Sequence, residues 1–200
     1  MPADAEITNL PDDVFRNIRE FVPIDALFLV ANRHLHAMKR RLHYYRFTKE
    51  CSLEYHASKT FREHVKRRIS DISLQLSLCL INYNHIRDMS ALGGVDSLDL
   101  PECSNITDVS ALGGVHTLNL SGCRSITDVS ALRGVHTLYL SWCSNITDVS
   151  ALGEVHTLYL SWCSNITDVS ALGGVHTLDL SWCSNITDVS ALGGVHTLDL

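Results

Sequence analysis

The sequence lacks any long apolar run. Its longest strongly apolar stretch, residues 26–31, is far shorter than the roughly 20 residues of a membrane-spanning helix, although hydrophobic residues make up 46% of the 200-residue chain. The amino terminus also lacks the cationic and then apolar pattern of a secretory signal. We therefore expect a folded protein without a membrane-spanning segment or an export signal.

The sequence also lacks the motifs of an enzyme. Gly113-Gly114 belongs to a repeated turn and not to a phosphate-binding loop of the form G-x-x-x-x-G-K-[ST]. Ser121 and Asp128 recur along the chain, whereas a catalytic triad needs one unique constellation. We therefore predict no catalytic residue and no bound cofactor.

Histidines recur at one repeat position, at first sight a metal or pH site. Side chains in such a row would point in parallel, without supporting carboxylates, whereas metal ligands must converge. We therefore expect no metal ion and a solvated row beside the strands. The row consists of His116, His136, His156, His176 and His196.

Paired cysteines are not indicated, because the sequence has seven of them, an odd number. Five hold one repeat position, at a spacing that is too long for a zinc site. This pattern favours reduced, buried thiols in an intracellular protein. These residues are Cys103, Cys123, Cys143, Cys163 and Cys183.

Positive charge is scarce in the second part of the chain. Residues 1–80 carry 13 Lys and Arg against 10 Asp and Glu, whereas residues 81–200 carry 3 against 12. The formal net charge of −6 therefore combines a mildly basic, non-repetitive amino-terminal part with an acidic carboxy-terminal part. Two parts with different roles are the natural inference.

What the sequence contains in abundance is a repeat of 20 residues. One unit, V-H-T-L-N-L-S-G-C-R-S-I-T-D-V-S-A-L-R-G, begins at Val115. It restarts at Val135, Val155, Val175 and Val195, an altered copy begins at Val95, and a degraded one occupies residues 75–94. A constant period without insertions predicts a stacked solenoid, an architecture typical of macromolecular binding.

The apolar positions of one unit predict its local structure. The L-x-L step has the period of a strand, and the later three-residue spacing suits tight turns or a 3₁₀ segment. Val135-x-x-Leu138-x-Leu140-x-x-Cys143-x-x-Ile146 resembles the leucine-rich repeat signature. This resemblance implies an α/β fold over residues 75–200: a leucine-rich repeat solenoid with short parallel strands on a concave face and turns or 3₁₀ segments on the convex one.

Function is expected where the units differ, because the core positions stay uniform. The residue between the two strand leucines and the residue before the cysteine both vary and are often aromatic or acidic. Exposed Trp and Tyr are frequent interface hot spots, so we predict a partner-binding concave face there; the alternative is a purely structural ladder. The candidate residues are Asp99, Glu102, Tyr139, Trp142, Tyr159, Trp162, Asp179 and Trp182.

The amino-terminal head, residues 1–42, predicts about three short helices. Its L-P-D-D-V start, followed by Ile18 and Val22-Pro23, resembles an F-box, with a shortened stretch after Asp25 and Leu35 at a commonly aromatic position. An F-box before leucine-rich repeats is a known pairing. The resemblance implies docking onto a Skp-type adaptor of a cullin–RING ubiquitin ligase; the alternative is an amino-terminal cap for the solenoid. The implied contact residues are Leu10, Pro11, Val14, Ile18 and Val22.

Residues 43–74 predict a helical linker or cap, with Phe61, Val65 and Ile69 on one face. Its basic segment, residues 62–68, is the only candidate for nucleic-acid contact. Without interleaved aromatic residues and beside an acidic array, this segment is not expected to bind nucleic acid.

These features together predict a non-enzymatic, cytoplasmic or nuclear adaptor that recruits a target protein to a ubiquitin ligase. The competing hypothesis is a free-standing scaffold that binds or masks a partner. The sequence names no target protein. Because Leu200 falls within the strand of a further unit, we expect either a truncated chain or an end that a partner covers.

Overall fold

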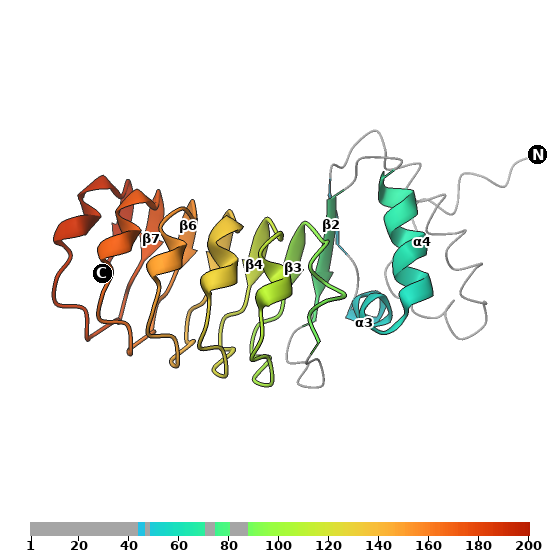
Figure 1. Ribbon diagram of the computed structural model, residues 1–200, viewed down its shortest axis with the longest axis horizontal. Helices are drawn as coiled ribbons and strands as arrows, with labels where there is room; N and C mark the ends of the chain where they lie inside the picture. Colours follow the sequence, from blue (N-terminus) through green and yellow to red (C-terminus); the bar gives the residue numbers. More distant parts are fainter. Residues whose placement is uncertain (1–43, 47–48, 71–74, 81–87) are drawn as a thin grey trace, which may run out of the picture.

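The computed structural model describes residues 44–46, 49–70, 75–80 and 88–200 (Figure 1). Its strands form one parallel sheet of eight strands, in the order of the sequence. The strands are β1 (Tyr44–Arg46), β2 (Gln75–Cys79), β3 (Ser97–Asp99), β4 (Thr117–Asn119), β5 (Thr137–Tyr139), β6 (Thr157–Tyr159), β7 (Thr177–Asp179) and β8 (Thr197–Asp199).

From β3 onward the register advances by one repeat at each strand. Leu118 of β4 lies opposite Leu98 on one side and Leu138 on the other, so equivalent residues line up across the sheet. The 20-residue period of the sequence is therefore the period of the coils, and the described coils form a leucine-rich repeat solenoid.

From β3 onward each coil returns through a short 3₁₀ segment, one of the two forms that the three-residue spacing predicts. In Figure 1 these segments lie on the opposite side of the solenoid from the strands. A carboxylate starts each one: the N–H of Ser130 donates to Asp128 Oδ1 over 2.8 Å, and Ser150 donates likewise to Asp148. The segments are η2 (Ser110–Leu112), η3 (Ser130–Gly134), η4 (Ser150–Leu152), η5 (Ser170–Gly174) and η6 (Ser190–Gly194).

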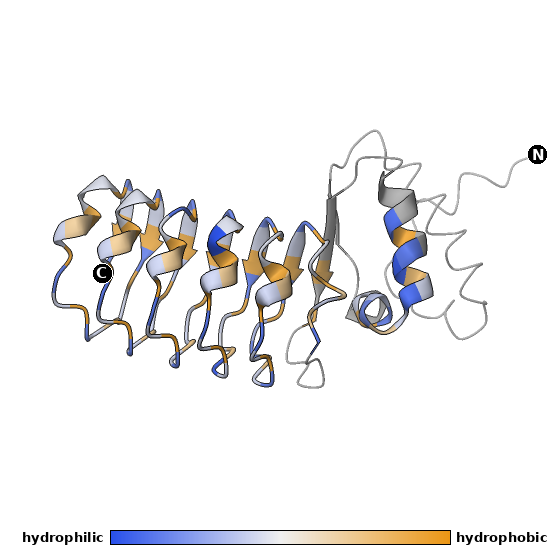
Figure 2. Cartoon of the chain, viewed as in Figure 1, coloured by the Kyte–Doolittle hydropathy of each residue, from blue (hydrophilic) through white to orange (hydrophobic). Residues whose placement is uncertain are grey.

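The core is a column of apolar side chains between the strands and the 3₁₀ segments. Hydrophobic residues recur at the same places in successive coils (Figure 2). In the coil that begins at Val115, every predicted apolar side chain is at most 2% exposed. These are Val115, Leu118, Leu120, Cys123, Ile126, Val129 and Leu132.

Hydrogen bonds join each coil to the next along the whole array. The N–H of Leu120 donates to Tyr139 O over 2.9 Å, and the N–H groups of His136 and Thr137 both donate to His116 O over 3.0 Å. A single coil cannot satisfy these groups by itself. Stability therefore depends on contacts between neighbouring coils, as in other solenoids.

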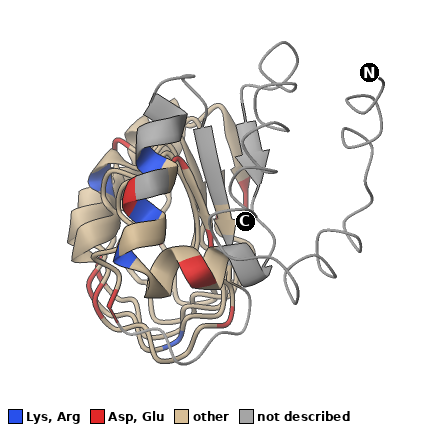
Figure 3. Cartoon of the chain, turned by 90° about the vertical axis from the view of Figure 1, so that its right-hand side faces the viewer, with Lys and Arg blue, Asp and Glu red and all other residues tan. Residues whose placement is uncertain are grey.

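Two helices, α3 (Lys49–Ala57) and α4 (Lys59–Ser70), lie beside β2 at the end of the array shown in Figure 1. Tyr55 and Val65 are buried in the same apolar cluster as the coils. Figure 3 looks onto this end and shows Lys and Arg residues on the described part of α4. One of them, Arg62, is used internally, because its guanidinium donates to Tyr55 O over 2.9 Å and to His56 O.

None of the helices in the described ranges is long and apolar enough to cross a bilayer.

Candidate functional site

The strand residues that vary between units form one row on the outer face of the sheet. In β4 to β7 the middle leucine is buried and both flanking side chains are half-buried on the other face. Strand pairing places the third strand residue beside its equivalent in the next coil. We call these residues the strand row; they are Asp99, Asn119, Tyr139, Tyr159, Asp179 and Asp199.

The centre of the strand row is a stacked pair of phenol rings. The ring centroids of Tyr139 and Tyr159 lie 4.6 Å apart with an interplanar angle of 3°. Partial burial, and to a smaller extent the neighbouring Tyr159, raise the pKa of Tyr139. On one side of this pair, the amide of Asn119 donates to the carboxylate of Asp99 over 2.8 Å. The predicted residues Asp99, Tyr139, Tyr159 and Asp179 therefore lie in one continuous row.

A second row follows directly after the strands, at the residue before each cysteine. We call it the turn row; it consists of Glu102, Gly122, Trp142, Trp162 and Trp182. The indole centroids of Trp142 and Trp162 lie 4.4 Å apart, and those of Trp162 and Trp182 lie 4.8 Å apart, with nearly parallel planes. The tryptophans are 46%, 39% and 68% exposed, respectively. The predicted aromatic patch therefore consists of two adjacent stacks, one of tyrosine and one of tryptophan.

The backbone of the turn row is unusual. Every residue in it has a positive φ: 59° at Glu102, 76° at Gly122, and 66°, 64° and 65° at the three tryptophans. The turn explains why. The N–H of Cys143 donates to Leu140 O over 3.1 Å, which makes Trp142 the third residue of a four-residue turn, a position that favours glycine when φ is positive.

These conformations have an energetic consequence. A positive φ costs a non-glycine residue roughly 1–2 kcal/mol, and each aromatic stack returns about 0.5–1.5 kcal/mol. Since the indoles lie at the surface and outside the coil core, the fold gains little from them. Backbone strain of this kind clusters at functional sites, so the turn row is the best candidate for a binding surface.

The structure also shows a polar contact between the two rows that the sequence did not predict. The hydroxyls of Ser141 and Ser161 lie 2.8 Å apart. The one available signal for the turn geometry was Gly122, the single glycine at the tryptophan position.

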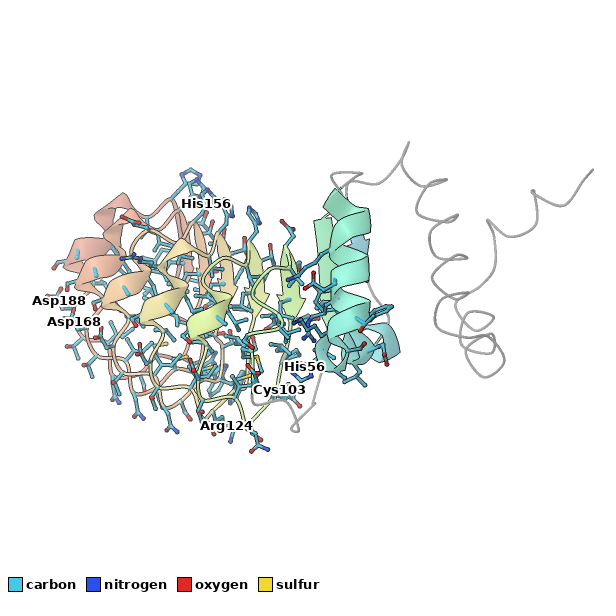
Figure 4. All side chains as sticks on the ribbon, turned by 45° about the vertical axis from the view of Figure 1, so that its right-hand side comes forward. His56, Cys103, Arg124, His156, Asp168 and Asp188 are labelled. Atoms are coloured by element: carbon cyan, nitrogen blue, oxygen red, sulfur yellow. The ribbon has the colours of Figure 1, made fainter. Side chains whose placement is uncertain are left out.

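The histidines form an exposed stack at another edge of the coils, where Figure 4 labels His156. The rings of His116, His136 and His156 lie 4.6 Å apart and nearly parallel, and Nδ1 of each faces the hydroxyl of the following threonine. Partial desolvation and then the neighbouring imidazoles lower the pKa of His136. Among the described residues, no group of three or more His, Cys, Asp or Glu side chains is placed to hold a metal ion.

The five cysteines of the repeat lie buried in the coils as free thiols, as predicted from their odd number and shared repeat position. The thiol of Cys123 donates to Leu100 O of the preceding coil over 3.1 Å, and Cys163 donates likewise to Leu140 O over 3.2 Å. Burial raises the pKa of both thiols to about 12. A buried thiol of this kind is a structural group and a poor nucleophile.

The acidic residues of the 3₁₀ segments have a local role. Hydrogen bonds from Ser130 lower the pKa of Asp128, and hydrogen bonds from Ser170 lower that of Asp168, which Figure 4 labels at the turns. These carboxylates fix the coil geometry.

The residues expected to contact an adaptor, Leu10, Pro11, Val14, Ile18 and Val22, all lie outside the described residues.

Comparison with known proteins gives distant structural likeness only. No protein family and no curated protein matches the sequence. Internalin C2 from Listeria monocytogenes shares 20% identity at a TM-score of 0.39, over 66% of this chain and 63% of its own. The functional domain of InlJ from Listeria monocytogenes, described as including a cysteine ladder, shares 16% identity at a TM-score of 0.34, over 64% and 44% of the two chains. This chain thus spans less than two thirds of either structure, and we assign the fold from the coils themselves.

Proposed function

We propose that this chain is a non-enzymatic interaction scaffold that binds a protein partner on the outer face of its sheet, across the strand row and the turn row. The observation that carries this proposal is the row of three exposed tryptophans at positive φ. Glycine would hold the same turn without strain, as Gly122 does in the same chain.

The chemistry of the two rows suits a protein interface. Trp and Tyr are enriched among the residues that dominate binding energy, and an indole or phenol offers a large contact area with few rotatable bonds. Stacking fixes Trp162 between two other indoles, so little side-chain entropy would be lost on binding. The acidic residues Asp99, Glu102 and Asp179 lie in the same rows and would favour a partner with basic groups.

Partner capture from the native cell tests this proposal. The full chain is compared with a variant in which Trp142, Trp162 and Trp182 are all replaced by glycine. A matched control replaces Asp128, Asp148 and Asp168 by asparagine, which keeps an oxygen acceptor for the following serine N–H. We expect the same partner to bind the parent and the asparagine control and to be lost with the glycine variant. Retention by the glycine variant, in a folded state shown by circular dichroism, would contradict the proposal.

The finer role as a ubiquitin-ligase adaptor is also a proposal, and it rests on the F-box-like sequence of the head. A ligase subunit of this kind acts in the cytoplasm or nucleus, which is therefore the proposed location. The alternative is that the head only caps the solenoid and that the scaffold acts alone by masking its partner.

A pull-down with a Skp-type adaptor distinguishes these two roles. We expect the parent chain to bind the adaptor and the variant with Leu10, Pro11 and Ile18 replaced by alanine to lose it. Equal binding of both chains, or none by the parent, would leave only the free-standing scaffold. Deletion of residues 1–42 adds a second comparison, because a purely structural cap predicts aggregation without any loss of ligase-dependent activity.

A further inference from the structure

The turn row is interrupted at Gly122, which leaves one face of Trp142 open inside the row; in the structure the outer face of Trp182 is also uncovered, but no acidic turn-row residue lies beyond it. Trp162 is covered on both faces by its neighbours, and Trp142 is covered on one face by Trp162. The other face of Trp142 points toward the preceding coil, where the equivalent residue is Gly122 and has no side chain. Coils in a parallel sheet lie about 4.8 Å apart, so a planar group above Gly122 would occupy the next place in the stack.

The carboxylate of Glu102 lies on the other side of Gly122 from Trp142. Glu102 is exposed, and its Cγ lies 3.2 Å from where a Cβ on Gly122 would be, so its side chain leans over the glycine. Within the described part of the chain, the Glu102 carboxylate has no hydrogen bond or ion pair. No described group pairs with this carboxylate, so it can pair with a cation that enters between it and Trp142.

The open face of Trp142 and the carboxylate of Glu102 together favour a planar cation between them. A guanidinium is planar, stacks on aromatic faces and pairs with a carboxylate through two parallel N–H groups. An uncharged ring would stack but leave the Glu102 carboxylate unpaired. The surrounding repeats carry 3 Lys and Arg against 12 Asp and Glu over residues 81–200, so they attract basic segments. The nearest cation in sequence is Arg124, whose backbone N–H donates to Gly122 O over 2.9 Å and whose side chain lies at the lower edge of the coils in Figure 4.

We propose that the protein partner presents an arginine to this place, which we call the Gly122 position. The guanidinium stacks on the open face of Trp142 above Gly122 and pairs with Glu102. This inference rests on the proposed function, in which the outer face of the sheet binds a protein. It adds that the partner has an exposed arginine, and it fixes where on the face that arginine lies.

The test uses two small peptides on the intact chain, followed by nuclear magnetic resonance. One is acetyl-Gly-Gly-arginine-Gly-Gly-amide, and the other carries citrulline, which is uncharged and nearly isosteric, in place of the arginine. The sequence contains only three tryptophans, all in the turn row, so each indole N–H signal reports on this surface alone. We expect the arginine peptide to shift Trp142 most and Trp162, which is covered on both faces, least. The citrulline peptide should bind at least about fivefold more weakly.

Variants of the chain distinguish binding at the Gly122 position from binding elsewhere on the two rows. E102Q should bind the arginine peptide about two- to fivefold more weakly, as expected for an exposed charge pair. G122W fills the place with a residue that three other coils accommodate, and it should abolish the shift at Trp142. R124A should bind at least as tightly as the parent, and weaker binding would indicate an anion site and overturn the inference.

Equal affinity for the two peptides, or an equal shift at all three indoles, would also overturn the inference. Neither result bears on the proposed function, which fails only if the triple glycine variant keeps the protein partner.

Discussion

Replacement of Trp162 by glycine and by alanine tests whether the positive φ of the turn row strains a residue that has a side chain, so that the tryptophans lower the stability of the turn. Both substitutions remove the two ring contacts of Trp162, at centroid distances of 4.4 and 4.8 Å. They differ only at the backbone, because alanine keeps a Cβ at a φ of 64° and glycine does not. We expect the glycine variant to be the more stable by about 1 kcal/mol, since alanine at a positive φ is strained.

A core substitution sets the scale for this comparison. Leu160→Ala, at a fully buried position directly after β6 and two residues before Trp162, should cost about 2–5 kcal/mol. Trp162→Gly should cost less, because relief of roughly 1–2 kcal/mol of backbone strain offsets much of the two lost stacks, each about 0.5–1.5 kcal/mol. Both tryptophan variants should bind the partner more weakly than the parent.

Urea unfolding followed by far-ultraviolet circular dichroism measures these differences without relying on tryptophan fluorescence. An alanine variant as stable as the glycine variant would show that the turn does not require a positive φ. A glycine variant as unstable as Leu160→Ala would show that the indoles belong to the core. Either result would remove the physical reason for assigning binding to the turn row.

Three further predictions concern the other rows of the solenoid. Cys123 and Cys163, whose thiol pKa values burial raises to about 12, should resist iodoacetamide at pH 8 until urea unfolds the coils, and rapid native labelling by peptide mass spectrometry would contradict this. The pKa of His136 is lowered in the folded chain, so the unfolded chain binds the proton more readily, and the contribution of His136 to stability should fall as the pH drops below about 6.5. His136→Gln should therefore make the urea midpoint depend less on pH, and an unchanged pH dependence would contradict this prediction. Asp148→Ala, which removes the acceptor of the Ser150 N–H, should lower the urea midpoint, whereas Asp148→Asn should lower it less, and equal midpoints for the two variants would refute the structural role of this hydrogen bond.

The repeat made most of the solenoid predictable. The L-x-L step places Leu118 and Leu120 inside the coil, and the three-residue spacing from Cys123 to Leu132 matches the turns and the 3₁₀ segment. The burial of the cysteines also followed from their spacing. These predictions succeeded because one pattern repeated in every unit leaves little choice of period or register.

Backbone details outside that pattern were not predictable in the same way. The positive φ of Trp142 depends on the hydrogen bond between Cys143 N and Leu140 O, and residue preference alone argues against tryptophan in such a turn. Likewise, β1 (Tyr44–Arg46) forms in a segment that was expected to be helical. Its strand conformation is supported by pairing with β2, a partner about thirty residues away, and local propensity carries no information on that pairing.

The unchanging register between coils has a genetic consequence. Each coil contacts its neighbours through equivalent residues, so deletion of residues 141–160 would join Leu140 to Ser161 and restore the same backbone and core contacts. Units this similar in sequence favour unequal recombination, which adds or removes whole coils in one step. The number of tryptophans in the turn row, and with it the length of the proposed binding surface, can therefore change by whole coils without a change of register.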